Sequence, residues 1–216
     1  MISIYYTEVY GWEAAIRGMR NPMNSWDKSD STWEFVEDPA IINPNDEVKW
    51  IIGENDHDLM MRLAKGGSVH AKYRRMITVT CDITAPLYWW KEYDTYKIAT
   101  VANSCSTMHK IHEKEFTLDD FSYEHLSACS KQCLEMTIKE LNYNRTKFIE
   151  TKEKEYWYNM IQLLPSSYNQ KRTVQLNYEV LVGMYRDRKN HKLNEWVDLC
   201  KWIETLPYSE LITQNE

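Results

Sequence analysis

A run of small polar side chains around one cysteine is the first place in this sequence where chemistry could occur. Residues 103–107 read Asn-Ser-Cys-Ser-Thr, so Cys105 is surrounded by groups that donate and accept hydrogen bonds. A thiolate can attack an electron-poor ring carbon when a neighbouring base activates it, and His109 is the nearest base in the sequence. A lone cysteine is more often inert packing, so both the nucleophilic and the structural interpretation of Cys105 stay open.

The remaining histidines and cysteines do not predict a metal site. His109 and His112 are three residues apart and could share an ion on a helix, but no third ligand is indicated, so no metal is expected. The five cysteines are odd in number and lack paired zinc-type spacing. Cys129 and Cys133 are four apart on an expected helix, where they should face the core as small apolar groups. This pattern favours a reduced, cytoplasmic protein.

Composition favours one soluble domain over residues 1–216. Hydrophobic residues make up 43% of the chain, and no stretch approaches the roughly 18 apolar residues of a membrane span, so no membrane partner is expected. The formal charge of -6 gives no general attraction to a nucleic-acid polymer. The 9 Trp and 15 Tyr residues provide large rings of the kind that fill subunit interfaces, so a homo-oligomer is expected.

Hydrophobic periodicity predicts several helices and a few strands around the polar run. Apolar side chains recur at helical spacing in five segments: 12–19, 56–65, 151–163, 178–185 and 193–200. A capping-box pattern at Thr117–Asp120 predicts the start of a longer helix that reaches about Leu141. Strands are expected at 2–9, 76–83 and 173–176, and loops at 21–31 and 39–46. Helices and strands that do not alternate regularly predict an α+β fold.

The strand before the polar run has the clearest pattern. Ile77, Val79, Cys81 and Ile83 alternate with more polar residues, which predicts one buried face. Pro86 then suits the first turn of a short aromatic helix, where its missing N–H has no cost. In that helix, Trp89-Trp90 could be a stacking platform or, more commonly for rings beside a buried strand, part of the core.

The order of these features resembles a known family. The sequence contains, in this order, His70, an alternating strand, Ala85-Pro86, an aromatic helix, Thr95-Tyr96-Lys97 and Cys105. The match described next needs no alignment gap between them. This order resembles the active-site segment of the flavin-dependent thymidylate synthases, in which an Arg-His-Arg triplet stands where Thr95-Tyr96-Lys97 falls and a Ser where Cys105 falls. Residues 164–196 resemble the closing pattern of the same family, with Leu164-Pro165, Asn177, Leu181 and Arg188 in register.

The resemblance implies a fold, an assembly and a chemistry. The fold would be α+β, with a curved, mostly antiparallel sheet flanked by long helices, in a homotetramer whose sites lie between subunits. FAD would be the cofactor: reduced flavin supplies hydride in the family's reaction, and a folate supplies one carbon to the uracil ring. By position, His70, Thr95, Tyr96 and Lys97 would bind the cofactor, and for His70 a capping or core role stays open as the alternative. The substrate, a pyrimidine nucleotide or another small molecule, would contact Glu92, Asn103, Thr107 and Arg188, and Cys105 would take the catalytic position.

The sequence departs from the family at the residues that read the ligand. Glu92 replaces a Gln, and Asn103 replaces a Glu. Thr107 and Ile161 replace two Args that would bind a phosphate. Each lost charge-assisted contact weakens anion binding by about 1.5–3 kcal/mol. Lys97 and Arg188 keep positive charges, and Tyr96 keeps an aromatic ring that could stack.

Three functions are compatible with these departures. The first is a diverged protein that binds or modifies a pyrimidine nucleotide with the help of flavin. The second is a non-catalytic protein that binds or sequesters a nucleotide on the same scaffold. The third is a structural oligomer with a collapsed pocket, in which Tyr96 and Lys97 would be packed against protein.

Overall fold

The computed structural model describes residues 1–35 and 48–214, so the predicted loop at 39–46 lies outside the described residues. The chain falls into two compact units. The first unit comprises Met1–Thr7, Cys81–Val174 and Lys192–Leu199, and the second comprises Glu8–Thr80, Gln175–His191 and Cys200–Glu216. The expected organisation as a single domain over residues 1–216 stays a prediction.

The chain is α+β, as predicted, with antiparallel sheets and long helices. The larger sheet has the strand order β1-β4-β6-β5, formed by β1 (Ser3–Tyr10), β4 (Thr78–Pro86), β6 (Asn169–Asn177) and β5 (Val101–Ser104). A separate antiparallel pair joins β2 (Thr32–Phe35) to β3 (Val48–Ile51). The predicted strand at 76–83 is confirmed as β4, and Ile77, Val79, Cys81 and Ile83 are all buried.

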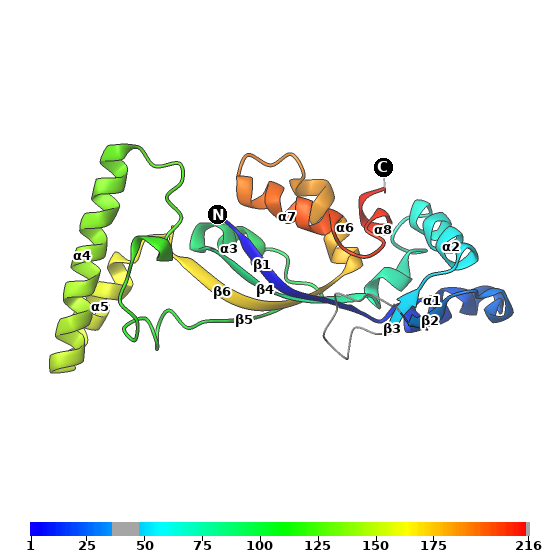
Figure 1. Cartoon of the computed structure of the whole chain (residues 1–216), viewed down its shortest axis with the longest axis horizontal. Helices are drawn as coiled ribbons and strands as arrows, with labels where there is room; N and C mark the ends of the chain where they lie inside the picture. The colour runs from blue at the N-terminus through cyan, green and yellow to red at the C-terminus, as the bar shows by residue number, and fades with distance from the viewer. Residues whose placement is uncertain (36–47, 215–216) are drawn as a thin grey trace. The chain divides into compact units, whose positions relative to one another are not determined.

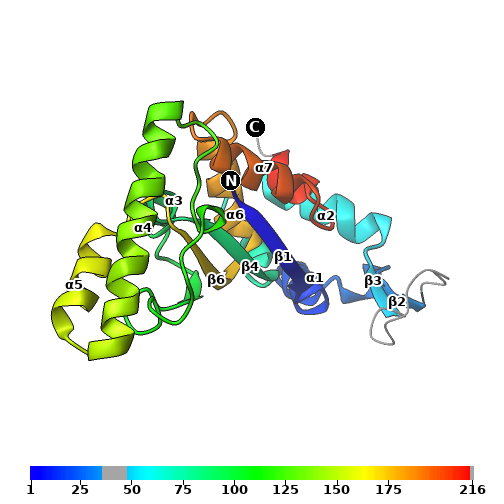
Figure 2. The same cartoon turned by 60° about the vertical axis from the view of Figure 1, so that its left-hand side comes forward.

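The first unit contains a helical hairpin and a short aromatic helix. The hairpin pairs α4 (Ala128–Thr151) with α5 (Lys154–Leu163), and Figures 1 and 2 show the two helices lying side by side. Leu134, Ile138 and Leu141 of α4 pack with Met160 of α5 in one hydrophobic cluster. The aromatic helix is α3 (Leu87–Tyr93), and a 3-10 turn, η4, covers Leu118–Asp120.

The second unit contains helices from three parts of the sequence. They are α1 (Trp12–Arg20), α2 (Glu54–Lys65), α6 (Tyr178–Arg188) and α8 (Glu210–Thr213), with 3-10 turns η1 (Asn21–Met23), η2 (Trp26–Lys28) and η3 (Lys72–Arg75). Helix α7 (Asn194–Glu204) contributes residues to both units. All five helices predicted from single periodic segments are present, as α1, α2, α5, α6 and α7. No helix within the described ranges has the length and apolar composition needed to cross a membrane.

The predicted start of the long helix is wrong. The capping box at Thr117 and Asp120 does form, but it caps only the 3-10 turn η4. Helix α4 begins later, at Ala128, after the N-cap residue Ser127. Between them the chain is extended at Phe121, which is buried and forms a bridge with Tyr168. Burying this ring against the strand segment therefore outweighs continuing the helix from its local start signal.

The expectation that Cys129 and Cys133 face the core is also wrong. Both thiols are exposed, because the apolar stripe of α4 that contacts α5 follows Leu134, Ile138 and Leu141 instead. All five cysteines are free.

A fully buried carboxylate organises the second unit. Asp56, on α2, has no solvent exposure and lies 2.6 Å from the guanidinium of Arg20, which is itself only 4% exposed. The other carboxylate oxygen accepts hydrogen bonds from the hydroxyls of Ser29 (2.7 Å) and Ser31 (2.6 Å). The backbone N–H groups of Asp30 (3.2 Å) and Ser31 (3.1 Å) also donate to it. Burial alone would raise the pKa of Asp56, but the bonds from Ser31, Ser29 and Arg20 lower it below its ordinary value.

Asp30 completes the connection by capping α2. Its two carboxylate oxygens accept from the backbone N–H groups of Asn55 (3.0 Å) and Asp56 (3.1 Å) at the start of that helix. A Cβ atom at Gly53 would lie 2.2 Å from Cγ of Asp30, so only glycine leaves room for this cap. The segment at residues 29–31 is thereby held to the first turn of α2.

We predict that Asp56→Asn destabilises the protein by about 3–5 kcal/mol, because it leaves the buried Arg20 without its counter-charge. The measurement is the free energy of unfolding in urea. The matched control is Glu13→Gln, which removes an exposed pair to Arg17 (3.1 Å) and should change stability by less than about 1 kcal/mol.

The lowered pKa of Asp56 also predicts how the stability difference between wild type and Asp56→Asn depends on pH. A carboxylate with a depressed folded-state pKa stabilises the fold above its unfolded pKa of about 3.9, and this contribution disappears as pH falls through the folded value. The stability gap between wild type and Asp56→Asn should therefore be constant above about pH 5 and shrink below about pH 4. A gap that stays unchanged into acid would contradict this assignment.

Candidate functional site

The aromatic residues of α3 form a buried aromatic cluster in the first unit. Trp89, Trp90 and Tyr93 are all buried, and the ring of Trp89 lies 4.8 Å from both Trp90 and Trp196 of α7. Trp196 is also fully buried. Trp89-Trp90 are therefore core residues that fix the position of α3, and the core interpretation of this pair is the correct one.

Two of the predicted site residues meet at Trp196. The indole N–H of Trp196 donates to the carboxylate of Glu92 at 3.0 Å, and the ring of Tyr96 lies 5.9 Å from the Trp196 ring. Both Glu92 and Tyr96 are partly exposed. The buried aromatic core thus holds one anionic and one aromatic side chain at its border.

The segment after α3 is a sequence of tight turns that presents Lys97. The Thr95 hydroxyl donates to the Glu92 carbonyl at 2.7 Å, and the Lys97 N–H donates to the Thr95 carbonyl at 3.1 Å. The Thr100 hydroxyl donates to the Tyr96 carbonyl. Thr95 and Lys97 are exposed, whereas Tyr96 is partly buried against Trp196, so the collapsed-pocket alternative stays a prediction.

The buried side-chain amide of Gln170 holds the segment that carries Cys105. The carbonyl of Cys105 accepts from Nε2 of Gln170 at 2.7 Å, and its N–H donates to the carbonyl of Lys171 at 2.9 Å. Gln170 is only 7% exposed, and its own oxygen accepts from Nε of Arg172 at 3.0 Å. The backbone at Cys105 is therefore fixed by β6, while the thiol itself is exposed.

The basic pair on β6 has acidic and aromatic partners within the first unit. The Arg172 guanidinium lies 2.7 Å from the carboxylate of Asp94 and 4.2 Å from the centre of the Trp90 ring. Lys171 lies 2.7 Å from Asp82, and the hydrogen bonds from Lys171 and Thr173 hold the pKa of Asp82 below its usual range. These side chains stabilise the strand and its neighbours.

The other predicted residues are distributed over both units. Asn103 and Thr107 flank Cys105 in the first unit, the former exposed and the latter partly buried. In the second unit His70 is exposed in the turn after α2, where its N–H donates to the Gly67 carbonyl at 3.0 Å. Arg188, also in the second unit, is partly buried at the last residue of α6.

Ile161, which the sequence resemblance aligns with an Arg, has an apolar environment in the structure. It is partly buried on α5 and packs against the cluster formed by Ile111, Phe116, Phe121, Leu134, Ile138, Leu141 and Met160. A phosphate has no charged partner at this position.

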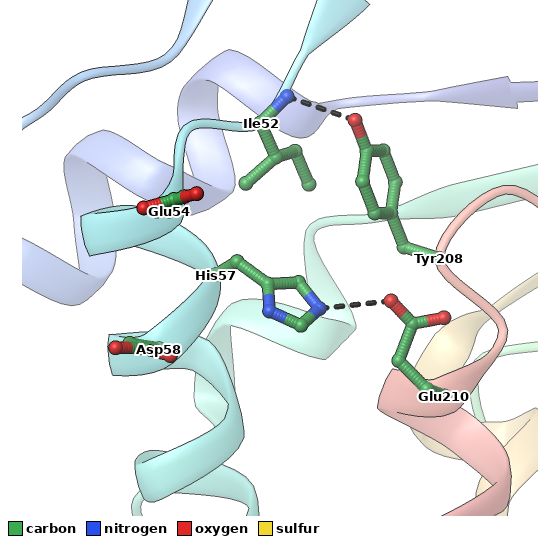
Figure 3. A pocket seen from close by; sticks show the side chains of 6 residues that line it. All are labelled: Ile52, Glu54, His57, Asp58, Tyr208 and Glu210. Carbon is green, nitrogen blue, oxygen red and sulfur yellow. Dashed lines mark hydrogen bonds and ion pairs between the residues drawn. The ribbon is translucent and has the colours of Figure 1, made fainter.

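The second unit contains a polar cavity that the sequence did not indicate. It measures about 390 Å³ and is lined by Ile52, Glu54, His57, Asp58, Tyr208 and Glu210 (Figure 3). Nε2 of His57 lies 2.8 Å from the carboxylate of Glu210, and the Ile52 N–H donates to the Tyr208 hydroxyl oxygen at 2.9 Å. His57 and Glu210 are 153 residues apart, which is why no local pattern reveals the pair. Three carboxylates line this cavity, so it disfavours the phosphate of a nucleotide.

Comparison with known proteins identifies the fold. No family model matches the chain, and no curated protein matches it. Among solved structures it is similar to flavin-dependent thymidylate synthases. One is thymidylate synthase X from Helicobacter pylori with FAD and dUMP, which is 16% identical with a TM-score of 0.66, over 99% of this chain and 97% of that chain.

A second structure of the Helicobacter pylori enzyme, also complexed with FAD and dUMP, is 14% identical with a TM-score of 0.65. It covers 98% of this chain and 97% of that chain. At this identity the likeness establishes the fold, and the predicted fold-level relation is confirmed along the whole chain.

We predict that Gln170→Ala loosens the Cys105 segment. Losing the amide leaves the Cys105 carbonyl and the Arg172 Nε without these partners, which weakens local stability by about 1–3 kcal/mol. Amide hydrogen exchange at residues 103–107 should accelerate about tenfold or more. The exposed Gln132→Ala is the control, and exchange that stays at the wild-type rate in Gln170→Ala would contradict the assigned role.

Proposed function

We propose that this protein binds FAD and a pyrimidine nucleotide at a site between subunits of a homotetramer. The observation that carries the proposal is the fold likeness over 99% of the chain to a thymidylate synthase solved with FAD and dUMP. The register of His70, Ala85-Pro86, Cys105 and Arg188 with that family's motifs supports the same conclusion.

The side chains at the border of the first unit fit a flavin nucleotide in their chemistry. Lys97 is an exposed cation suited to a phosphate of FAD, and Tyr96 is a partly exposed ring suited to stacking on an aromatic system. Thr95, exposed in the same unit, and His70, exposed in the second unit, are the other hydrogen-bonding groups that the resemblance assigns to the cofactor. When bound and reduced, a flavin supplies hydride. The residues of this chain would bind and orient it.

The nucleotide would be bound more by hydrogen bonds from neutral side chains than by ion pairs. Asn103 and Thr107 can hydrogen-bond a pyrimidine ring or sugar, and Arg188 supplies a cation for the phosphate. The carboxylate of Glu92 accepts from Trp196, so we assign it a role in holding the aromatic border and not a positive contribution to anion binding. Cys105 would take the position next to the reacting ring carbon.

A non-catalytic nucleotide-binding protein is the second candidate, and Ile161 favours it. Its packing in an apolar cluster removes one of the cations that the family uses for phosphate, which would be compatible with retained ring recognition and lost chemistry. Pure protein that oxidises NADPH in the presence of dUMP supports the enzyme. Protein that binds dUMP and leaves it unchanged supports the binder.

The first test is flavin binding. We expect purified protein to bind FAD, seen as quenching of flavin fluorescence, and Lys97→Ala to weaken binding roughly tenfold or more through loss of a charge-assisted contact. Lys139→Ala, an exposed lysine on α4, is the matched control for a simple change in net charge. Absence of FAD binding by folded wild-type protein would contradict the assignment of FAD as the cofactor.

The second test restores a lost charge. Thr107→Arg should raise the affinity for dUMP about tenfold, because it supplies a guanidinium close to the position where the family has one. Calorimetric titration with dUMP measures the effect, and Thr107→Gln controls for side-chain size without charge. Equal affinities in the Arg and Gln variants, with both proteins folded, would count against a nucleotide phosphate beside residue 107.

A further inference from the structure

Three buried tryptophans of the first unit contact one another but differ in what lies at their indole N–H groups. Trp89 and Trp196 have no solvent exposure, and Trp90 is 1% exposed. The ring of Trp89 lies 4.8 Å from each of the other two rings. Rings this close can exchange an electron, so the surroundings of each indole decide which of the three is oxidised most easily.

Two of these indoles lack a group that could take their proton. Removing one electron from an indole makes its N–H strongly acidic. Nε1 of Trp89 has no hydrogen-bond partner among the described residues, so oxidised Trp89 would be an uncompensated buried cation. The Trp90 N–H donates to the backbone carbonyl of Gln170 at 2.9 Å, and a carbonyl is too weak a base to take the proton. The Arg172 guanidinium, 4.2 Å from the centre of the Trp90 ring, also opposes a positive charge there.

Of the three tryptophans, Trp196 has a base at its N–H. Its indole donates to the carboxylate of Glu92 at 3.0 Å. An ionised carboxylate favours a positive charge beside it and can accept the proton. After the transfer, a neutral indole radical faces a neutral carboxylic acid, so no new charge is left in the buried cluster. Tyr96 is partly exposed, and its ring lies 5.9 Å from that of Trp196, so it connects this indole to the border of the cluster.

We propose that Trp196 and Glu92 form a proton-coupled electron-donor site, which supplies one electron to a one-electron oxidant beside Tyr96. In this step the oxidant gains the electron, the N–H bond of Trp196 breaks, and its proton moves to Glu92. The site consists of residues of the first unit alone. It does not depend on the proposed function, although a photoexcited flavin is an oxidant of this class.

The test is photo-oxidation of the full-length protein by a ruthenium polypyridyl complex attached near the site. The complex is linked to Lys91→Cys, an exposed position on α3, in a chain whose exposed thiols are removed by Cys105→Ser, Cys129→Ser and Cys133→Ser. A laser flash with a soluble electron acceptor oxidises the complex, which then takes an electron from the protein. We expect transient absorption to show a neutral indole radical and not an indole radical cation. Because the label is the oxidant, the result does not depend on whether FAD binds.

Two pairs of variants of the labelled protein assign the radical. Trp196→Phe should lose most of the radical signal, whereas Trp89→Phe removes an equally buried indole without an acceptor and should keep it. Glu92→Gln keeps a hydrogen-bond acceptor but loses the base, so the radical cation should replace the neutral radical. Glu135→Gln, an exposed carboxylate on α4, is the matched control and should behave like the labelled wild type.

Three outcomes would overturn the site. These are the absence of an indole radical in the labelled wild type, an undiminished signal in Trp196→Phe, and a neutral radical that forms in Glu92→Gln at the wild-type rate. Near-ultraviolet circular dichroism of each variant establishes that the aromatic cluster is still packed. Should Trp196→Phe disturb that packing, Glu92→Gln decides the question, because Glu92 is partly exposed at the border of the cluster.

Discussion

A carboxylate with no access to water must have its charge and its lone pairs satisfied by protein, and Asp56 imposes this condition on the second unit. Its partners come from the end of α1 (Arg20) and from the connecting segment (Ser29 and Ser31), while Asp56 itself belongs to α2. Three stretches of chain must therefore meet before the charge is neutralised. Removing any one partner leaves a desolvated polar group, so the arrangement is cooperative and tolerates little adjustment.

The first unit contains a buried aromatic cluster as well as the hydrophobic cluster of α4 and α5, and several polar side chains lie at the border of the aromatic cluster. Trp89 and Trp196 are completely buried, while Glu92, Tyr96 and Arg172 take positions from contacts with tryptophan rings or indole N–H groups. Side chains at such a border can change without disturbing the packing beneath them. This separation is compatible with a fold shared with thymidylate synthase X at 16% identity, because residues at the border can differ while the packing beneath them stays.

Periodicity predicted the fold well wherever one face of an element is buried. The alternation along β4 and the apolar stripes of α1, α2 and α6 are local, so they are visible in the sequence. The start of α4 was missed because burial of Phe121 overrides the capping box at Thr117. Three contacts join residues that are far apart in the sequence. Arg20 and Asp56 are 36 positions apart, His57 and Glu210 are 153 apart, and Cys105 and Gln170 are 65 apart. Such contacts depend on the folded arrangement and have no local signature.

The two positions at which the family's guanidinium groups are missing are physically unlike each other. Thr107 is partly buried in a polar turn segment, whereas Ile161, also partly buried, packs against an apolar cluster of α4 and α5. A guanidinium at residue 161 would replace an apolar side chain that packs on that cluster, and its partial desolvation there would offset some of the gain from a phosphate contact. The apolar residue at 161 therefore contributes to the packing of the helical hairpin, while Thr107 is a small polar residue of a turn. Under the proposed function, a nucleotide would accordingly be held by hydrogen bonds and the remaining cations, and not by arginines at positions 107 and 161.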